Sequence, residues 1–95
     1  MAAYVIAENL AMRDPGGMAE YRAGVAATVE RYGGKFRVRG GAIEALEGPA
    51  PAGLVVIEFE SAEKARAWYN SQEYQPLVAI RQRCADTRLT LVEGV

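Results

Sequence analysis

Residues 54–59 read LVVIEF and are almost continuously apolar and β-branched. A strand with one wet face would alternate polar and apolar residues, so this run predicts a central strand that is covered on both faces. The earlier segment Lys35–Arg39 does alternate, with Phe36 and Val38 on one face and basic residues on the other. That pattern predicts a strand with one buried side. Glycines and prolines in residues 48–53 predict the turn that makes the two strands neighbours.

The rest of the chain supplies the elements around this hairpin. The capping residues and the glycine and proline positions predict where they begin and end. Before the hairpin come a strand at residues 3–10 (AYVIAENL) and a helix that is capped by Asp14 and ended by Gly33-Gly34. Within the hairpin, a bend or bulge at Gly40-Gly41 is followed by a weak continuation of the second strand over residues 42–47. After the hairpin come a helix capped by Ser61, a break at Asn70-Ser71, a third helical segment from near Ser71 to about Ala85, and a strand at residues 89–93 (LTLVE). This βαββαβ order predicts an α+β, ferredoxin-like fold, in which helices cover one face of a four-stranded antiparallel sheet.

Length and composition indicate one small domain without a nucleic-acid partner. The chain has 95 residues, 51% of them hydrophobic, and a net charge of −1. Nucleic-acid binding depends largely on Lys and Arg that neutralise phosphates, and no basic excess is present. The first ten residues lack the basic region and long apolar run of a secretory signal, and no stretch has the length of a membrane span. We therefore expect a cytoplasmic protein that does not bind membranes.

The chain contains no histidine and a single cysteine, Cys84. This composition excludes Ser-His-Asp and Cys-His catalytic groups, imidazole-ligated iron and haem, and an internal disulfide. We expect neither a metal site nor a cofactor. Proton transfer would depend on Asp, Glu, Tyr, Lys or the one thiol, each with a pKa moved by burial or by a neighbouring charge.

The apolar strands also predict a partner subunit. Both helical layers should cover the same face of the sheet, yet residues 54–59 and 3–10 lack the alternation expected if the other face met water. The simplest cover is the same face of a second copy, because a two-fold axis lets a self-complementary patch bury itself. We therefore expect a homodimer through the sheet faces. The alternative is a monomer with a mildly apolar sheet surface.

Segments along nearly the whole chain resemble the DUF1330 family of the dimeric α+β barrel superfamily. They are AYVI at residues 3–6, EYR at 20–22, YGG with RGG within 32–41, VVIEF at 55–59, AWYNSQEYQ at 67–75 and ADTRLTLVEG at 85–94. The resemblance implies a ferredoxin-like protomer whose sheet packs on a partner's sheet, in a family without an assigned function. Relatives by fold include cofactor-independent monooxygenases, muconolactone isomerases and haem-binding chlorite dismutases, but a fold does not carry function across such distances.

Two charged residues on the strands are candidates for a site. Arg39 precedes the Gly40-Gly41 bend, and a bulge there could aim its guanidinium at an anionic ligand. The alternative, favoured for Lys35 and Arg37, is a solvated edge strand whose charges prevent aggregation. Glu58 interrupts the apolar central strand and needs a partner, for which we predict Arg39. It could act as a catalytic acid or base, or the two residues could form a structural ion pair.

Aromatic residues on the predicted helices are the remaining candidates. Tyr21, Trp68 and Tyr74, with Tyr69, could line a cleft between helices and sheet, with Tyr74 the strongest candidate because it follows the break at Asn70-Ser71. The alternative is that this stripe is core. Arg81 is expected only to finish a helix end, and Cys84 to be inert packing.

Two functional hypotheses follow. In the first, a homodimer binds a small organic, anionic ligand in the cleft, held by Arg39 between walls formed by Tyr21, Trp68 and Tyr74. Its enzymatic version is an isomerase or monooxygenase without a cofactor, in which Glu58 moves a proton. In the second, the protein is a non-catalytic dimer that acts only through protein contacts.

Overall fold

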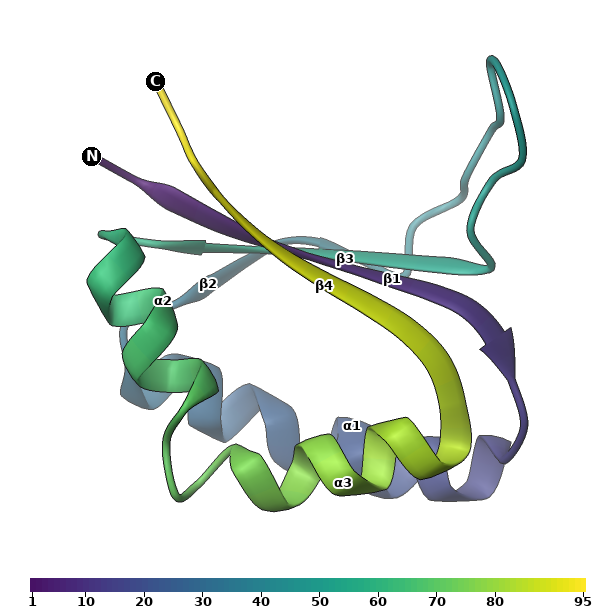
Figure 1. Ribbon diagram of the computed structural model, residues 1–95, viewed down its shortest axis with the longest axis horizontal. Helices are drawn as coiled ribbons and strands as arrows, with labels where there is room; N and C mark the ends of the chain where they lie inside the picture. Colours follow the sequence, from purple (N-terminus) through teal and green to yellow (C-terminus); the bar gives the residue numbers. More distant parts are fainter.

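The computed structural model describes residues 1–95 and has the predicted element order, including the predicted break between its last two helices (Figure 1). The four strands form one antiparallel sheet in the order β2-β3-β1-β4, so β3 is central as predicted. The ferredoxin-like α+β fold is confirmed. The elements are β1 (Ala3–Met12), α1 (Pro15–Arg31), β2 (Lys35–Arg39), β3 (Gly53–Phe59), α2 (Ala62–Tyr69), α3 (Gln75–Cys84) and β4 (Ala85–Glu93).

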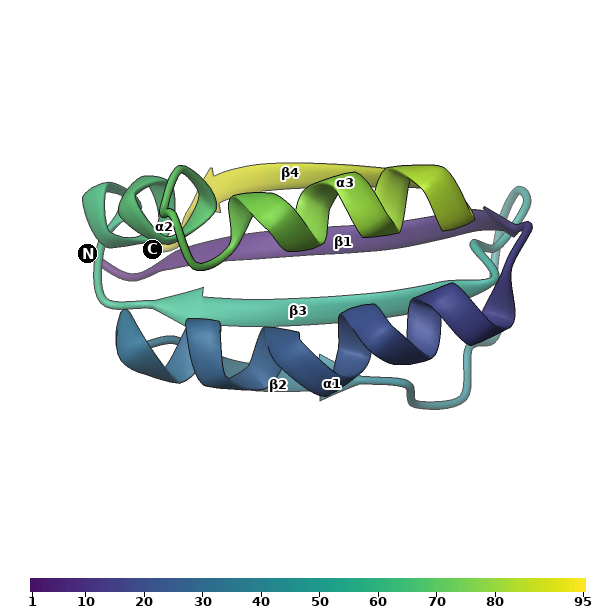
Figure 2. The same ribbon diagram turned by 90° about the horizontal axis from the view of Figure 1, so that it is seen from below.

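All three helices lie on one face of the sheet, here called the inner face (Figure 1). Seen from the helix side, α1 runs beside β2 and β3 while α3 runs beside β1 and β4 (Figure 2). α1 begins at its Asp14 cap, whose carboxylate accepts a hydrogen bond from the Gly17 backbone N–H at 3.2 Å. Gly17 also faces the Cys84 sulfur so closely that a β-carbon there would overlap it. The glycine therefore allows α1 to approach the end of α3.

The predicted continuation of β2 over residues 42–47 is wrong. Arg39 pairs with Val55, and β3 begins only at Gly53, so further pairing would need residues 47–52 as partners. Pro49 and Pro51 lie in that segment and have no N–H to donate to a strand ladder. Residues 40–52 instead form a loop, here called the arm, that rises from the sheet on the side away from the helices (Figure 1).

Other boundaries also differ from the predicted ones, most clearly the starts of β4 and of the third helical segment. β4 begins at Ala85 rather than Leu89, because β1 continues beyond an irregularity after Asn9 and gives its first residues a partner. The third helical segment begins at Gln75 rather than near Ser71, because a turn precedes it. In that turn the Ser71 hydroxyl accepts from the Tyr74 backbone N–H at 3.1 Å and donates to the Trp68 carbonyl at 2.7 Å.

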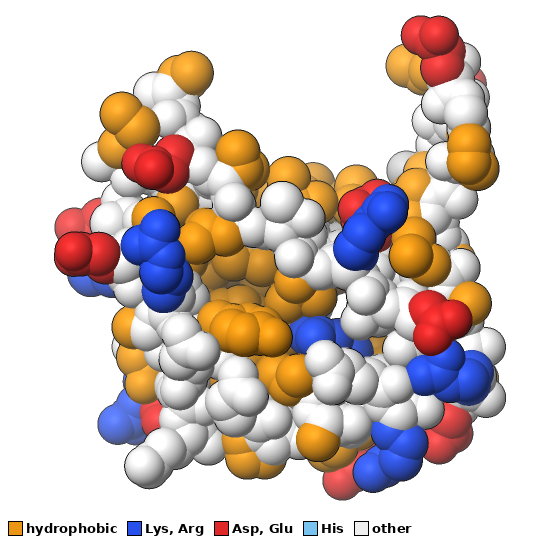
Figure 3. All heavy atoms as spheres, viewed as in Figure 1, with side chains coloured by type: hydrophobic (Ala, Val, Ile, Leu, Met, Phe, Trp, Pro, Cys, Tyr) orange, Lys and Arg blue, Asp and Glu red, His pale blue; other side chains and the backbone are white.

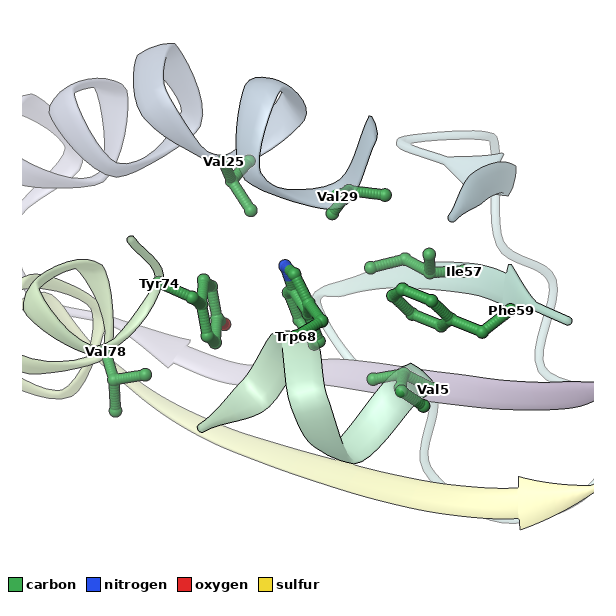
Figure 4. Close-up of a cluster of buried hydrophobic side chains, with 9 residues drawn as sticks. Val5, Val25, Val29, Ile57, Phe59, Trp68, Tyr74 and Val78 are labelled. Atoms are coloured by element: carbon green, nitrogen blue, oxygen red, sulfur yellow. The ribbon is translucent and has the colours of Figure 1, made fainter. Parts of the chain in front are cut away.

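The core lies between the inner face and the helices and is centred on Trp68 (Figure 4). Its indole stacks on the Tyr74 ring, with centroids 4.0 Å apart, and lies 5.5 Å from the Phe59 ring. The indole N–H donates to the Thr28 hydroxyl of α1 at 3.0 Å. Trp68 therefore has both its apolar surface and its polar atom satisfied inside the protein.

The other face of the sheet, here called the outer face, has no helix on it (Figure 1). The strand registers place apolar side chains along it, and Val38 and Val92 are 38% and 45% exposed. The outward carboxylates of β1 and β3 each form an ion pair with a neighbouring strand, Glu8 with Arg88 and Glu58 with Arg37. None of the helices combines the length and the apolar character that a membrane span requires.

Candidate functional site

A cavity of about 340 Å³ lies between the inner face and helices α1 and α3. The space-filling view shows a hollow between the two layers, with hydrophobic side chains on its walls and a basic side chain inside (Figure 3). Four of the five predicted site residues line this cavity, and the structure brings them together from four different elements. They are Tyr21 of α1, Arg39 of β2, Trp68 of α2 and Tyr74 at the start of α3.

Two tyrosines and an arginine form a hydrogen-bonded chain at the cavity wall. Arg81 donates from Nη1 to the Tyr74 hydroxyl at 2.6 Å, and this hydroxyl is 2.7 Å from that of Tyr21. A guanidinium can only donate, so the Tyr74 oxygen accepts and its proton is available for Tyr21. Burial raises the pKa of Tyr74 well above its usual range, and Tyr21 adds to the rise while Arg81 opposes it. Tyr74 therefore stays protonated at physiological pH.

Arg39 reaches the cavity because of a bulge in β2. Phe36 pairs with Ile57 and Val38 with Val56, so Arg37 has no opposite residue in β3. The extra residue reverses the alternation: Val38 lies on the outer face, not beside Phe36 as predicted, and Arg39 lies on the inner side. The Arg39 guanidinium is 4.3 Å from the centre of the Phe36 ring. The bulge therefore lies at Arg37, three residues before the predicted Gly40-Gly41, which forms only a bend.

Glu58 is not part of this cavity. It follows Ile57, whose side chain is buried under the helices, and so points to the outer face. Its carboxylate accepts from Arg37 Nε at 2.9 Å. The prediction that Arg39 is its partner is wrong, because the bulge turns Arg39 to the opposite face. This placement favours the ion-pair alternative for Glu58, and a role in proton transfer stays a prediction.

Two residues at the cavity were missed as candidates. Arg81 was assigned only a helix end, but it is 6% exposed and lines the cavity. Its signal was present, since it continues the apolar stripe of Tyr74, Leu77, Val78 and Cys84. Asn9, in β1, also lines the cavity. Nothing in its local sequence distinguishes it from a residue at a strand end.

Comparison with known proteins identifies the family of the chain. A family model described as "Domain of unknown function (DUF1330)" matches residues 2–95. The chain belongs to the DUF1330 family. A search of curated proteins found no match to this DUF1330 chain.

Solved structures agree with the fold of this DUF1330 chain. A protein of unknown function from Rhodopseudomonas palustris is 20% identical, with a TM-score of 0.77 over 99% of this chain and 82% of that one. SnoaB, a cofactor-independent oxygenase from Streptomyces nogalater, is 15% identical, with a TM-score of 0.67 over 99% and 93%. A dimeric protein of unknown function with a ferredoxin-like fold from Bacteroides fragilis is 12% identical, with a TM-score of 0.64 over 98% and 96%. At these identities the likeness shows the fold alone.

Proposed function

We propose that this DUF1330 protein is a homodimer that binds a small organic molecule between α1, α3 and the inner face. The cavity of about 340 Å³ carries the proposal, because small-molecule sites have volumes of about 300–1,000 Å³, mostly apolar walls and a few polar groups. Here Tyr21, Trp68 and Tyr74 are the aromatic part of the walls, and Arg39 and Arg81 are among the polar groups. The stacked, hydrogen-bonded Trp68 belongs to both the core and the cavity wall.

The enzymatic version of this proposal is an isomerase or a cofactor-independent monooxygenase. The description of SnoaB supports the second for a protein of this fold. The cavity itself supports binding more directly than proton transfer. Glu8 is the one carboxylate residue on the lining, but its carboxylate points to the outer face, where Arg88 holds it with Nε–Oε1 at 3.2 Å. Glu58 lies on that outer face too.

The second copy would cover the outer face. Its apolar side chains lack a cover within the chain, and the ion pairs there leave little net charge to oppose a second identical face. The arm rises on the same side and carries Leu46, which is 87% exposed. Dimeric proteins among the solved structures of this fold support a homodimer.

Native mass spectrometry of the freshly purified protein tests both parts. We expect a species of twice the 10.3 kDa chain mass that carries a small molecule. Ala7→Leu places a larger side chain in the cavity and should abolish the added mass, whereas Ala79→Leu makes the same change at an exposed position of α3 and should retain it. A bare dimer in all three samples would favour the non-catalytic interaction module. A bare monomer would refute the sheet-to-sheet dimer.

A further inference from the structure

Two buried side-chain atoms in this protein lack a hydrogen-bond partner, and both belong to residues that line the same cavity. They are Nε of Arg81 and Oδ1 of Asn9. Unpaired buried polar atoms are rare in folded proteins, because each costs the solvation that it has lost. Both residues line one cavity, so a ligand there that carried an acceptor and a donor would satisfy Arg81 and Asn9 together.

Arg81 carries the stronger part of this argument because its charge is buried without a counter-ion. The residue is 6% exposed and forms no salt bridge, and the only hydrogen bond of its side chain goes to the neutral Tyr74 hydroxyl. The face of the Tyr21 ring, 5.9 Å from the guanidinium carbon, gives a further weak attraction. A guanidinium has five N–H donors and stays charged at any physiological pH. Such a group is costly to bury unless an anion accompanies it.

The other charged side chains that face the cavity are also basic. Arg22 and Arg39 also line it, and both are exposed, so they stand at its rim. Neither forms a salt bridge within the chain. Glu8 is the one acidic residue on the lining, but its carboxylate points to the outer face, where it pairs with Arg88. The field in the cavity is therefore positive, and it is strongest where water is least able to screen it.

We infer that the cavity binds a flat organic monocarboxylate, with Arg81 as the buried anchor of the carboxylate and Asn9 as the acceptor for a hydroxyl or amino group on the same molecule. This inference rests on the proposed ligand-binding function. The planar fork of a guanidinium matches the two oxygens of a carboxylate. The rings of Tyr21, Trp68 and Tyr74 supply flat apolar surface for an aromatic or unsaturated body.

The hydrogen-bonded tyrosines extend this anchor. Because Arg81 donates to Tyr74, the Tyr74 proton can point to Tyr21, which frees the Tyr21 proton for a ligand oxygen. The carboxylate would then receive donors from Arg81 and from one tyrosine hydroxyl. In this arrangement Tyr21 donates directly to the ligand, and Tyr74 is a positioning residue that acts through Tyr21.

Calorimetric titration with matched acids and amides tests the inference. The probes are benzoate, cinnamate and 4-hydroxybenzoate, each beside its uncharged primary amide, together with phenyl phosphate. In the unmodified protein we expect each acid to bind at least about tenfold more tightly than its amide, as hydrogen bonds to charged groups require. We also expect 4-hydroxybenzoate to bind more tightly than benzoate, and Asn9→Leu to remove that difference.

Three arginine variants assign the charge preference to one residue. Arg81→Met should reduce acid affinity at least tenfold and leave amide affinity unchanged, and Arg81→Lys should retain part of the preference because it keeps the charge but loses the fork. Arg83→Met changes an exposed arginine on the same helix and should change neither. The melting temperature of Arg81→Met without ligand should equal or exceed that of the unmodified protein, because the variant removes an uncompensated buried charge.

The outcomes separate this inference from the proposed function. Equal binding of acids and amides would overturn the carboxylate anchor and leave a ligand-binding cavity, and tighter binding of phenyl phosphate than of any acid would overturn the choice of carboxylate. A lower melting temperature in Arg81→Met with an unchanged acid preference would make Arg81 a structural residue. Failure of every probe at millimolar concentration, together with a bare native mass spectrum, would overturn both.

Discussion

The two faces of the sheet in this DUF1330 protein differ in whether their charged side chains have partners of opposite charge. On the outer face the carboxylates of Glu8 and Glu58 are each held by an arginine of a neighbouring strand. On the inner face the cavity is lined by arginines that have no carboxylate partner, and one of them, Arg81, is buried. A face whose charges cancel can meet a second copy of itself, while a face with an unpaired cation can meet an anion. The difference thus supports the proposal of a protein partner at one face and a small ligand at the other.

The largest expected effect is a loss of dimerisation through the outer face. Val92→Asp places a charge at an outward position of β4 that is 45% exposed in the single chain, so the monomer can hydrate it. In a sheet-to-sheet dimer the charge would be buried, and an uncompensated buried charge costs about 3–5 kcal/mol. We expect the dimer to weaken at least about 100-fold, measured by analytical ultracentrifugation over a concentration series.

Ala79→Asp is the matched control for this change, because Ala79 lies on the exposed side of α3. It should dimerise like the unmodified protein. Circular dichroism should show that both variants fold. If Val92→Asp dimerises as tightly as the control, the subunits do not meet through the outer face. That result would contradict the assignment of a protein partner to this face.

An effect of intermediate size is expected from the Tyr74 hydroxyl on the inner face. Tyr74→Phe removes the acceptor of the Arg81 hydrogen bond and should cost about 1–3 kcal/mol of unfolding free energy near neutral pH. The pKa of Tyr74 is raised from its ordinary value of 10.0, so above pH 10 the unfolded chain loses this proton while the folded chain keeps it. Stability from this group is complete below pH 10 and falls as pH rises, by up to about 1.4 kcal/mol per pH unit.

The stability difference between Tyr74→Phe and the unmodified protein should therefore narrow as the pH rises above 10, because the variant lacks this group. Urea unfolding at pH 8 and between pH 10 and 11.5 would measure it. Tyr32→Phe removes a half-buried hydroxyl that donates to Glu73 at 3.1 Å and serves as the control. If the stability difference from the unmodified protein narrows equally for both variants, the hydrogen-bonded chain of Arg81 and the two tyrosines is not the cause of the pH dependence.

The fold could be predicted from the sequence because its signals are local and agree with one another. The apolar run in β3, the Asp14 and Ser61 caps and the glycines after α1 each have one consistent interpretation. The errors lie where pairing between distant segments decides the outcome. The first residues of β4 form a strand only because β1 is long enough to pair with them. Residues 42–47 do not form a strand, because their pairing partners would include Pro49 and Pro51.

The candidate site was only partly predictable, for a similar reason. The aromatic side chains face inward with the helical period, so their meeting followed from the fold. Which face a strand residue occupies depends on an exact count of paired residues, and one bulged residue, Arg37, separates Arg39 from Glu58. Arg81 was missed because its position near a helix end offered a simpler explanation than burial. For an arginine that continues an apolar stripe, burial should be considered before a role at the helix end.

The smallest expected effect concerns Glu58, which sequence reasoning placed in the site and the structure places on the outer face. In the Val92→Asp background, Glu58→Gln should cost less than about 1 kcal/mol, since the pair with Arg37 is partly exposed, at 28% and 51%. In the same background its affinity for benzoate should stay within about twofold, because the sheet separates Glu58 from the cavity. Urea unfolding and calorimetric titration would measure the two quantities. A loss of benzoate binding as large as that of Arg81→Met would place Glu58 in the site after all, and would mean that the two faces are coupled through the strand they share.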